Sequence, residues 1–91
     1  MKTARIFVRG RVQGVGFRDW IVRKARALGL AGWVRNQSDD SVEILASGDD
    51  DAVEQLVRAA HQGPPFAHVT GVRVEDAEAE ASSGFARRPT L

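Results

Sequence analysis

Apolar and polar residues alternate along the first part of the chain and then change period after a pair of glycines. Within residues 4–12 apolar side chains alternate with arginines, the period of two expected of a half-buried strand. Phe7 interrupts the alternation, so we expect the second face of this strand to be partly covered. Beyond Gly16 the apolar residues recur at spacings of four, four and three, which predicts a helix with one apolar stripe, formed by Phe17, Ile21, Ala25 and Leu28.

The middle of the chain predicts a hairpin followed by a second helix. Residues 31–37 and 41–47 are strand-like and are joined by the polar residues 38–40. Three aspartates at 49–51 open the second helix, where acids suit the positive end of the dipole, and a Gly-Pro-Pro sequence at 63–65 ends it. Residues 69–74 predict a fourth strand, residues 77–83 a polar loop, and residues 85–88 are a candidate fifth strand.

This order of elements predicts an α+β fold. It matches the ferredoxin-like βαββαβ sandwich, in which an antiparallel sheet carries two helices on one face. A chain of 91 residues suits a single domain over residues 1–91. The architecture hosts many functions, so the function has to be argued from the site.

Composition narrows the chemistry that is available. The chain has no cysteine, which excludes thiolate nucleophiles, zinc-thiolate sites and disulfides. Neither a signal peptide nor a membrane span is visible, so we expect a cytoplasmic protein with no membrane partner. Residues 1–35 hold nine Lys or Arg and one acid, whereas the remainder holds four against eleven. This asymmetry favours an anionic partner for the N-terminal part, although a surface of balanced basic and acidic faces explains it equally well.

The segment VRGRVQGVGFR, residues 8–18, joins a strand to a helix through two closely spaced glycines. Glycines let backbone N–H groups turn inward, and a helix N-terminus adds unpaired donors and partial positive charge. Arg18 falls in the first turn of the helix, where a guanidinium can bind phosphate oxygens. The pattern predicts an anion cradle, but a bare G-x-G also fits a simple tight turn, and Arg18 also fits an exposed helix arginine.

The same segment resembles the first signature of the acylphosphatase family. GWVRNQSDDSVEILASG, residues 32–48, is similar to the second signature of that family, and GPPFAHV, residues 63–69, resembles the approach to its fourth strand. The resemblance runs from about residue 6 to residue 74, and its two signatures occur in the family's order.

The resemblance implies a function and a set of site residues. The family hydrolyses the carboxyl-phosphate bond of acylphosphates without a metal or other cofactor, releasing a carboxylate and inorganic phosphate. By resemblance, Asn36 orients the attacking water, and Arg18 is the second catalytic residue. The phosphoryl group, or a phosphate or sulfate anion in its place, would be bound by the backbone of Gln13, Gly14, Val15, Gly16, Phe17 and Arg18. Because an asparagine cannot take a proton at neutral pH, we expect a phosphate oxygen of the substrate to accept it.

Two residues depart from the family pattern, and two other functions compete. The family usually carries glycine at the position of Asp40, where we expect a positive φ, and an apolar residue at that of Arg87, which puts the last strand in doubt.

An RNA-binding module would need aromatic residues on the central strands, but residues 41–47 contain none, so no nucleic-acid partner is expected. A non-catalytic or auxiliary acylphosphatase-like domain is the other alternative. We expect a monomer that acts on a small-molecule acylphosphate.

Overall fold

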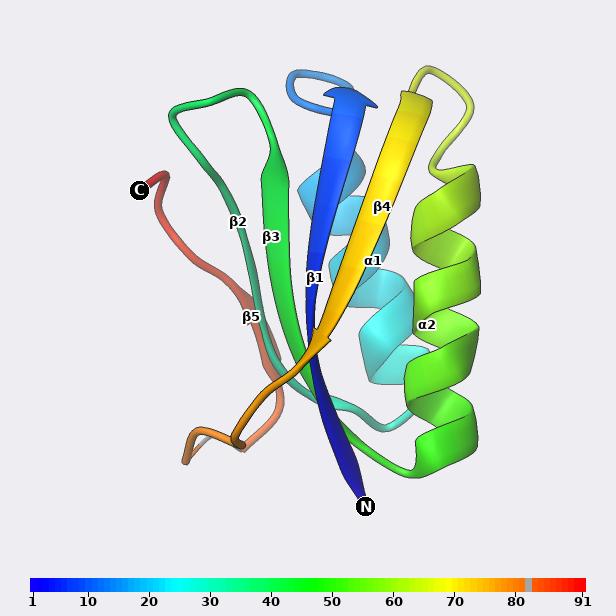
Figure 1. The fold of residues 1–91 in the computed structure, drawn as a ribbon, viewed down its shortest axis with the longest axis vertical. Coiled ribbons are helices and arrows are strands. Elements are labelled where there is room, and N and C mark those ends of the chain that lie inside the picture. The colour runs from blue at the N-terminus through cyan, green and yellow to red at the C-terminus, as the bar shows by residue number, and fades with distance from the viewer. Residues whose placement is uncertain (82) are drawn as a thin grey trace.

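The computed structural model describes residues 1–81 and 83–91, and its elements follow the predicted order. They are β1 (Lys2–Arg11), α1 (Phe17–Ala27), β2 (Ala31–Asn36), β3 (Val42–Gly48), α2 (Asp50–Gln62), β4 (His68–Asp76) and β5 (Phe85–Arg87). Both helices pack on one face of the sheet (Figure 1). The predicted α+β sandwich of the ferredoxin-like type is therefore confirmed. Ser82, in the loop predicted at 77–83, lies outside the described residues.

The sheet is mixed, because its last strand runs parallel to its neighbour. The strand order is β4-β1-β3-β2-β5, with antiparallel pairing among the first four and parallel pairing between β2 and β5. The purely antiparallel sheet of the prediction therefore holds for four strands only. β4 finishes at the same end of the sheet at which β2 begins. β5 follows β4 in the chain and lies on the far side of β2, so it runs in the same direction as β2 (Figure 1).

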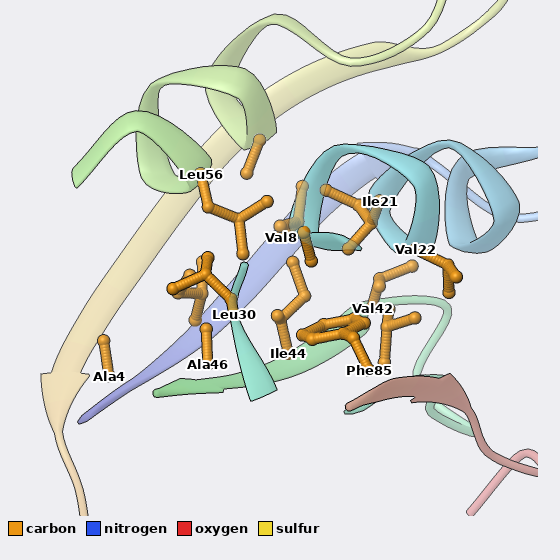
Figure 2. Packing of buried hydrophobic residues seen from close by; sticks show 14 of the residues in the cluster. Ala4, Val8, Ile21, Val22, Leu30, Val42, Ile44, Ala46, Leu56 and Phe85 are labelled. Atoms are coloured by element: carbon orange, nitrogen blue, oxygen red, sulfur yellow. The ribbon is translucent and has the colours of Figure 1, made fainter. Parts of the chain in front are cut away.

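The core lies between the helices and the sheet. α1 buries Phe17, Ile21, Val22 and Ala25, and α2 buries Ala52, Val53, Leu56 and Ala60. Figure 2 shows Ile21 and Leu56 reaching from the two helices toward Ile44 of the sheet. Each such side chain contributes about 1.5–3 kcal/mol when it is fully buried. The apolar stripe predicted for the first helix is confirmed: Phe17, Ile21 and Ala25 are buried, and Leu28, the C-cap residue, is half-buried and packs against the core.

The face of the sheet without helices is also covered, as the irregular position of Phe7 suggested. Trp33 and Glu43 lie on this face and are only 2% and 3% exposed. The guanidinium groups of Arg35 and Arg88 lie 4.6 and 4.7 Å from the centre of the Trp33 ring. Arginine side chains thus cover this face in the way that a second layer of apolar residues would.

Two loops meet at one end of the sheet. The β1–α1 loop and the β2–β3 hairpin lie side by side at the end where β1 and β2 finish (Figure 1). In the hairpin Asp40 has φ 72°, which confirms the positive φ expected there. Neither described helix combines the length and the hydropathy that a membrane span requires.

Candidate active site

The β1–α1 loop adopts the conformation that its glycines allow. Gly14 and Gly16 have φ 73° and 76°, in the left-handed region, and Gly16 is the N-cap of α1. A Cβ built at either position would meet open space, so backbone conformation, not crowding, requires glycine at both positions. In the described part of the chain the N–H groups of residues 14–16 donate no backbone hydrogen bond. Those of residues 17 and 18 lie in the first helical turn, where no intrahelical acceptor exists. The loop therefore presents free donors at the positive end of α1.

A depression of about 170 Å³ lies against this loop. Its volume is several times the roughly 30 Å³ that a water molecule occupies in the liquid, so a phosphoryl group has room in it. The lining residues come from the loop, the first turn of α1, β2 and β5, and they are Val12, Gly14, Gly16, Phe17, Arg18, Asp19, Asn36 and Arg87. The structure thus brings together five of the predicted site residues, which are Gly14, Gly16, Phe17, Arg18 and Asn36.

Arg18 is a positively charged residue in the lining of this depression. It is the second residue of α1 and is half-buried. Within the described residues its guanidinium has no ion pair and no hydrogen bond, so all five N–H donors are available to a bound anion. Guanidinium groups and helix N-termini are the groups with which proteins commonly bind phosphate and similar oxyanions, and here both lie on one small depression.

Asn36 is the last residue of β2, and its side chain is buried at the depression. The residue is 9% exposed, and among the described residues its Oδ1 is the buried side-chain atom for which the protein supplies no hydrogen-bond donor. Leaving such an atom unpaired costs about 1–3 kcal/mol, so its position calls for a functional reason. The main chain of Asn36 is fixed, because it pairs with Val42 and its carbonyl accepts the N–H of Leu91 at 3.1 Å.

The side chain of Gln13 has a structural role that the sequence did not indicate. Its Nε2 donates to the carbonyls of Gln37, at 2.9 Å, and Ser41, at 2.8 Å, in the β2–β3 hairpin. Neither Gln13 nor Val15 lines the depression with the other predicted residues. Gln13 instead joins the β1–α1 loop to the hairpin that follows Asn36, and no local pattern in the sequence indicates that contact.

Arg87 was expected to weaken the last strand, but the strand forms. Arg87 takes its place in β5 opposite Val34, and its Nη1 donates to Oδ1 of Asp19 at 2.9 Å. Both partners line the depression. Sequence reasoning missed these two residues as part of the site, because only the parallel pairing of β5 with β2 brings them together.

Other parts of the chain offer less for chemistry. In residues 1–81 and 83–91, no group of three or more His, Cys, Asp or Glu side chains is placed to hold a metal ion. A larger, open depression of about 580 Å³ lies beside the end of α1 and β5. The charged residue in its lining is Arg26, whose Nε donates to the carbonyl of Phe85 at 3.0 Å. The described residues that line it do not include a group of several charged side chains, so its size does not make it the reactive site.

Fold and site together define a ferredoxin-like α+β protein in which a glycine loop, a helix N-terminus and an arginine line one depression at the end of the sheet. Comparisons with known proteins agree with this class. The acylphosphatase family profile matches residues 4–87. The acylphosphatase of Acidiphilium cryptum is 52% identical over 99% of this chain and 99% of its own. This chain belongs to the acylphosphatase family, and its function is that of an acylphosphatase.

Solved structures show the same likeness. The crystal structure of acylphosphatase from Bacillus subtilis superposes with a TM-score of 0.93 and 43% identity, covering 97% of this chain and 99% of that one. The structure of full-length HypF in the phosphate- and nucleotide-bound form superposes with a TM-score of 0.90 and 25% identity. That match covers 98% of this chain but 12% of HypF, so the same fold also occurs as a small part of a much longer protein.

Proposed function

We propose that this acylphosphatase binds the phosphoryl group of its substrate in the depression beside the β1–α1 loop and hydrolyses the carboxyl-phosphate bond there. The observation that carries the proposal is the convergence of the free N–H groups of the loop, the unpaired guanidinium of Arg18 and the buried Oδ1 of Asn36. The first two suit an oxyanion, and the third suits a water molecule held next to it. In this proposal the backbone of residues 13–18 and the Arg18 side chain bind the phosphoryl oxygens.

Asn36 orients the nucleophile. Its Oδ1 accepts a hydrogen bond from the attacking water, which satisfies an acceptor that the protein itself leaves unpaired. The water oxygen bonds to phosphorus, the bond between phosphorus and the carboxyl oxygen breaks, and the carboxylate leaves with the electron pair. An amide cannot take a proton at neutral pH, so the proton lost by the water passes to a phosphoryl oxygen. The products are a carboxylate and inorganic phosphate.

The reaction needs neither a strong acid nor a covalent nucleophile in this scheme. A carboxylate is a good leaving group, so positioning and stabilisation of the phosphoryl charge carry most of the acceleration. The donors of the loop and of Arg18 take the role that a metal ion has in many phosphoryl-transfer sites. We therefore infer that hydrolysis is metal-independent. We also infer, from composition and size, that the protein is a cytoplasmic monomer.

The first test is hydrolysis of benzoyl phosphate by the wild-type protein, with and without a chelator, and by Arg18→Ala and Asn36→Ala. Removal of one preorganised group in such sites typically lowers kcat by about a hundredfold or more. We expect activity to survive the chelator and to fall by that order in both variants. Arg23→Ala is the matched control, because Arg23 is exposed on the same helix and does not line the depression. Activity lost with the chelator, or an equal loss in Arg23→Ala, would contradict the proposal.

Asn36→Asp tests whether an acceptor oxygen at this position is sufficient or whether the neutral amide is required. The aspartate keeps an acceptor oxygen at the same place but adds a negative charge beside the phosphoryl group and removes the amide. We expect a loss of rate close to that of Asn36→Ala. A rate equal to that of the wild type would mean that an acceptor oxygen is sufficient at this position and that the neutral amide is not required.

A non-catalytic, phosphate-binding role is the second candidate. The likeness to a small part of HypF supports it, because the same fold there belongs to a much longer protein. A folded wild-type protein that binds phosphate but leaves benzoyl phosphate intact would favour this candidate.

A further inference from the structure

Arg87 places a second guanidinium at the depression. We propose that Arg87 is an additional anion-binding residue, which holds the phosphoryl group from the side of β5 while Arg18 and the loop hold it from the side of α1. The inference rests on the proposed function, since it assigns a further residue to the same site. It depends on three observations: the direction of the side chain, its weak ion pair with Asp19 and the charge balance of the depression.

The parallel pairing of β5 aims Arg87 at the site. Phe85 is buried in the core and lies beside the helix layer (Figure 2). Successive side chains of a strand point to opposite faces, so Arg87, two residues on, points to the face that Phe85 occupies. Its ion pair with Asp19, in the first turn of α1, confirms that direction. Arg88 points the other way and lies over Trp33 on the face without helices.

The contact with Asp19 leaves Arg87 able to bind a second group. It uses Nη1, so other N–H donors of the guanidinium are free for an anion. The side chains of Arg87 and Asp19 are 50% and 59% exposed, and ion pairs at such exposure contribute little to stability. An incoming phosphoryl group can therefore share the guanidinium with Asp19 at little cost. Asp19 keeps the arginine at the depression when no anion is bound.

The charge balance of the depression also favours a binding role for Arg87. Its charged lining residues are Arg18, Asp19 and Arg87, so the side chains sum to one positive charge. Without Arg87 the charges of Arg18 and Asp19 would cancel. Attraction of an acylphosphate, which carries two negative charges, would then rest on the backbone donors alone. A second cation facing the anion restores a net attraction.

The test compares Arg87→Gln with Arg88→Gln. Both variants lose one positive charge at adjacent positions of the chain, but only Arg87 lines the depression. The Arg88 guanidinium donates to Glu80 at 3.3 Å instead. Binding of inorganic phosphate is measured by calorimetry, and its inhibition of benzoyl phosphate hydrolysis is measured as Ki. We expect Arg87→Gln to weaken phosphate binding by about three- to fivefold and to raise Ki by the same factor, which corresponds to the upper part of the range for an exposed ion pair. Arg88→Gln should stay within twofold of the wild type.

Two further measurements distinguish anion binding by Arg87 from a role in folding. The first is the phosphate affinity of Arg87→Lys. This variant keeps the charge but loses the planar arrangement of donors, so its phosphate affinity should fall between those of the wild type and Arg87→Gln. Thermal unfolding of each variant shows whether the fold is intact. A purely structural arginine would lower the unfolding temperature without changing the phosphate affinity of the folded protein. Phosphate affinity of folded Arg87→Gln within twofold of the wild type, or an equal loss in Arg88→Gln, would overturn the inference.

Calorimetry separates this inference from the proposed function. If the wild type binds phosphate through Arg87 but does not hydrolyse benzoyl phosphate, the inference stands and the proposed hydrolysis fails. If the wild type hydrolyses benzoyl phosphate and Arg87→Gln binds phosphate as tightly, only the inference fails. A folded wild-type protein that binds no phosphate would overturn both.

Discussion

Glu43 is the acid whose removal should destabilise this protein most clearly. It is 3% exposed and accepts hydrogen bonds from Arg5, from Arg35 at 2.9 Å and from Gln37 at 2.8 Å. Burial raises the pKa of this carboxyl, but the hydrogen bonds and charges of Arg5 and Arg35 together outweigh it and hold the pKa below its ordinary value. Glu43→Gln keeps the shape and one acceptor oxygen but removes the charge that neutralises both arginines.

The expected loss follows from the exposure of the partners. Removing one member of a fully buried ion pair costs about 3–5 kcal/mol. The side chains of Arg5 and Arg35 are still 30% and 22% exposed, so water can solvate part of their charge. We therefore expect Glu43→Gln to lower the free energy of unfolding by about 2 kcal/mol at pH 7, below the fully buried range. In a domain of this size that is a fall in Tm of roughly 10 °C.

The pH dependence gives a second, independent test. Because the folded pKa of Glu43 lies below its unfolded value, its contribution is fully present above the unfolded pKa and is lost as pH falls through the folded pKa. The difference between wild type and Glu43→Gln should be constant near neutral pH and should shrink below about pH 5. Denaturant unfolding at several pH values, followed by tryptophan fluorescence, measures it.

Glu75→Gln is the control for Glu43→Gln. Glu75 pairs with Arg73 at 3.1 Å, but the two side chains are 45% and 64% exposed, so this variant should change stability by less than about 0.5 kcal/mol. Two results would refute the reasoning: a Glu43→Gln variant as stable as Glu75→Gln at pH 7, or a deficit that does not diminish in acid.

Three further variants test the geometry of the site. Asp40→Gly should raise the free energy of unfolding by about 0.5 kcal/mol. Asp40 has φ 72°, a conformation that glycine adopts without strain, and the greater loss of backbone entropy by glycine on folding offsets part of this gain. Thermal unfolding measures the gain, and no gain would mean that the turn is unstrained. Gln13→Ala removes two hydrogen bonds between the β1–α1 loop and the β2–β3 hairpin, so kcat/KM for benzoyl phosphate should fall by about tenfold or more because the loop is misplaced. An unchanged kcat/KM in a folded variant would show that the loop keeps its position without these hydrogen bonds. Gly16→Ala should cost about 1 kcal/mol of stability, since φ is 76° there and a Cβ finds open space; a cost above about 3 kcal/mol in the same unfolding assay would mean that the methyl group does not fit.

Local patterns were sufficient for the elements and for the loop that lines the depression. The alternation of residues 4–12 and the stripe through Phe17, Ile21 and Ala25 are consequences of strand and helix periods, which depend only on neighbours in the chain. The cradle is also local, because the two glycines and Arg18 lie within five residues of one another. Asn36 was assigned by resemblance, and the structure places its side chain on the same depression as that loop.

Contacts between distant segments could not be predicted in this way. Gln13 donates hydrogen bonds to the β2–β3 hairpin, and Glu43 forms ion pairs with Arg5 of β1 and Arg35 of β2. Both sets of contacts depend on the register of the sheet. Arg87 counted as a defect of the last strand in the sequence, since an arginine in place of an apolar residue weakens a strand pattern. Its value depends on a parallel pairing to β2 and on Asp19, which lies 68 residues earlier.

The sequence by itself determined the order of helices and strands, the glycine loop with its arginine and the family to which the chain is similar. These features arise from residues close together in the chain, where backbone preference and side-chain period act directly. The tertiary structure alone decided which charges surround the cradle and which are neutralised elsewhere. Arg5 and Arg35 form ion pairs with Glu43, whereas Arg87 lines the depression. Charge pairing depends on distances in space, and only strand register and helix packing set those distances.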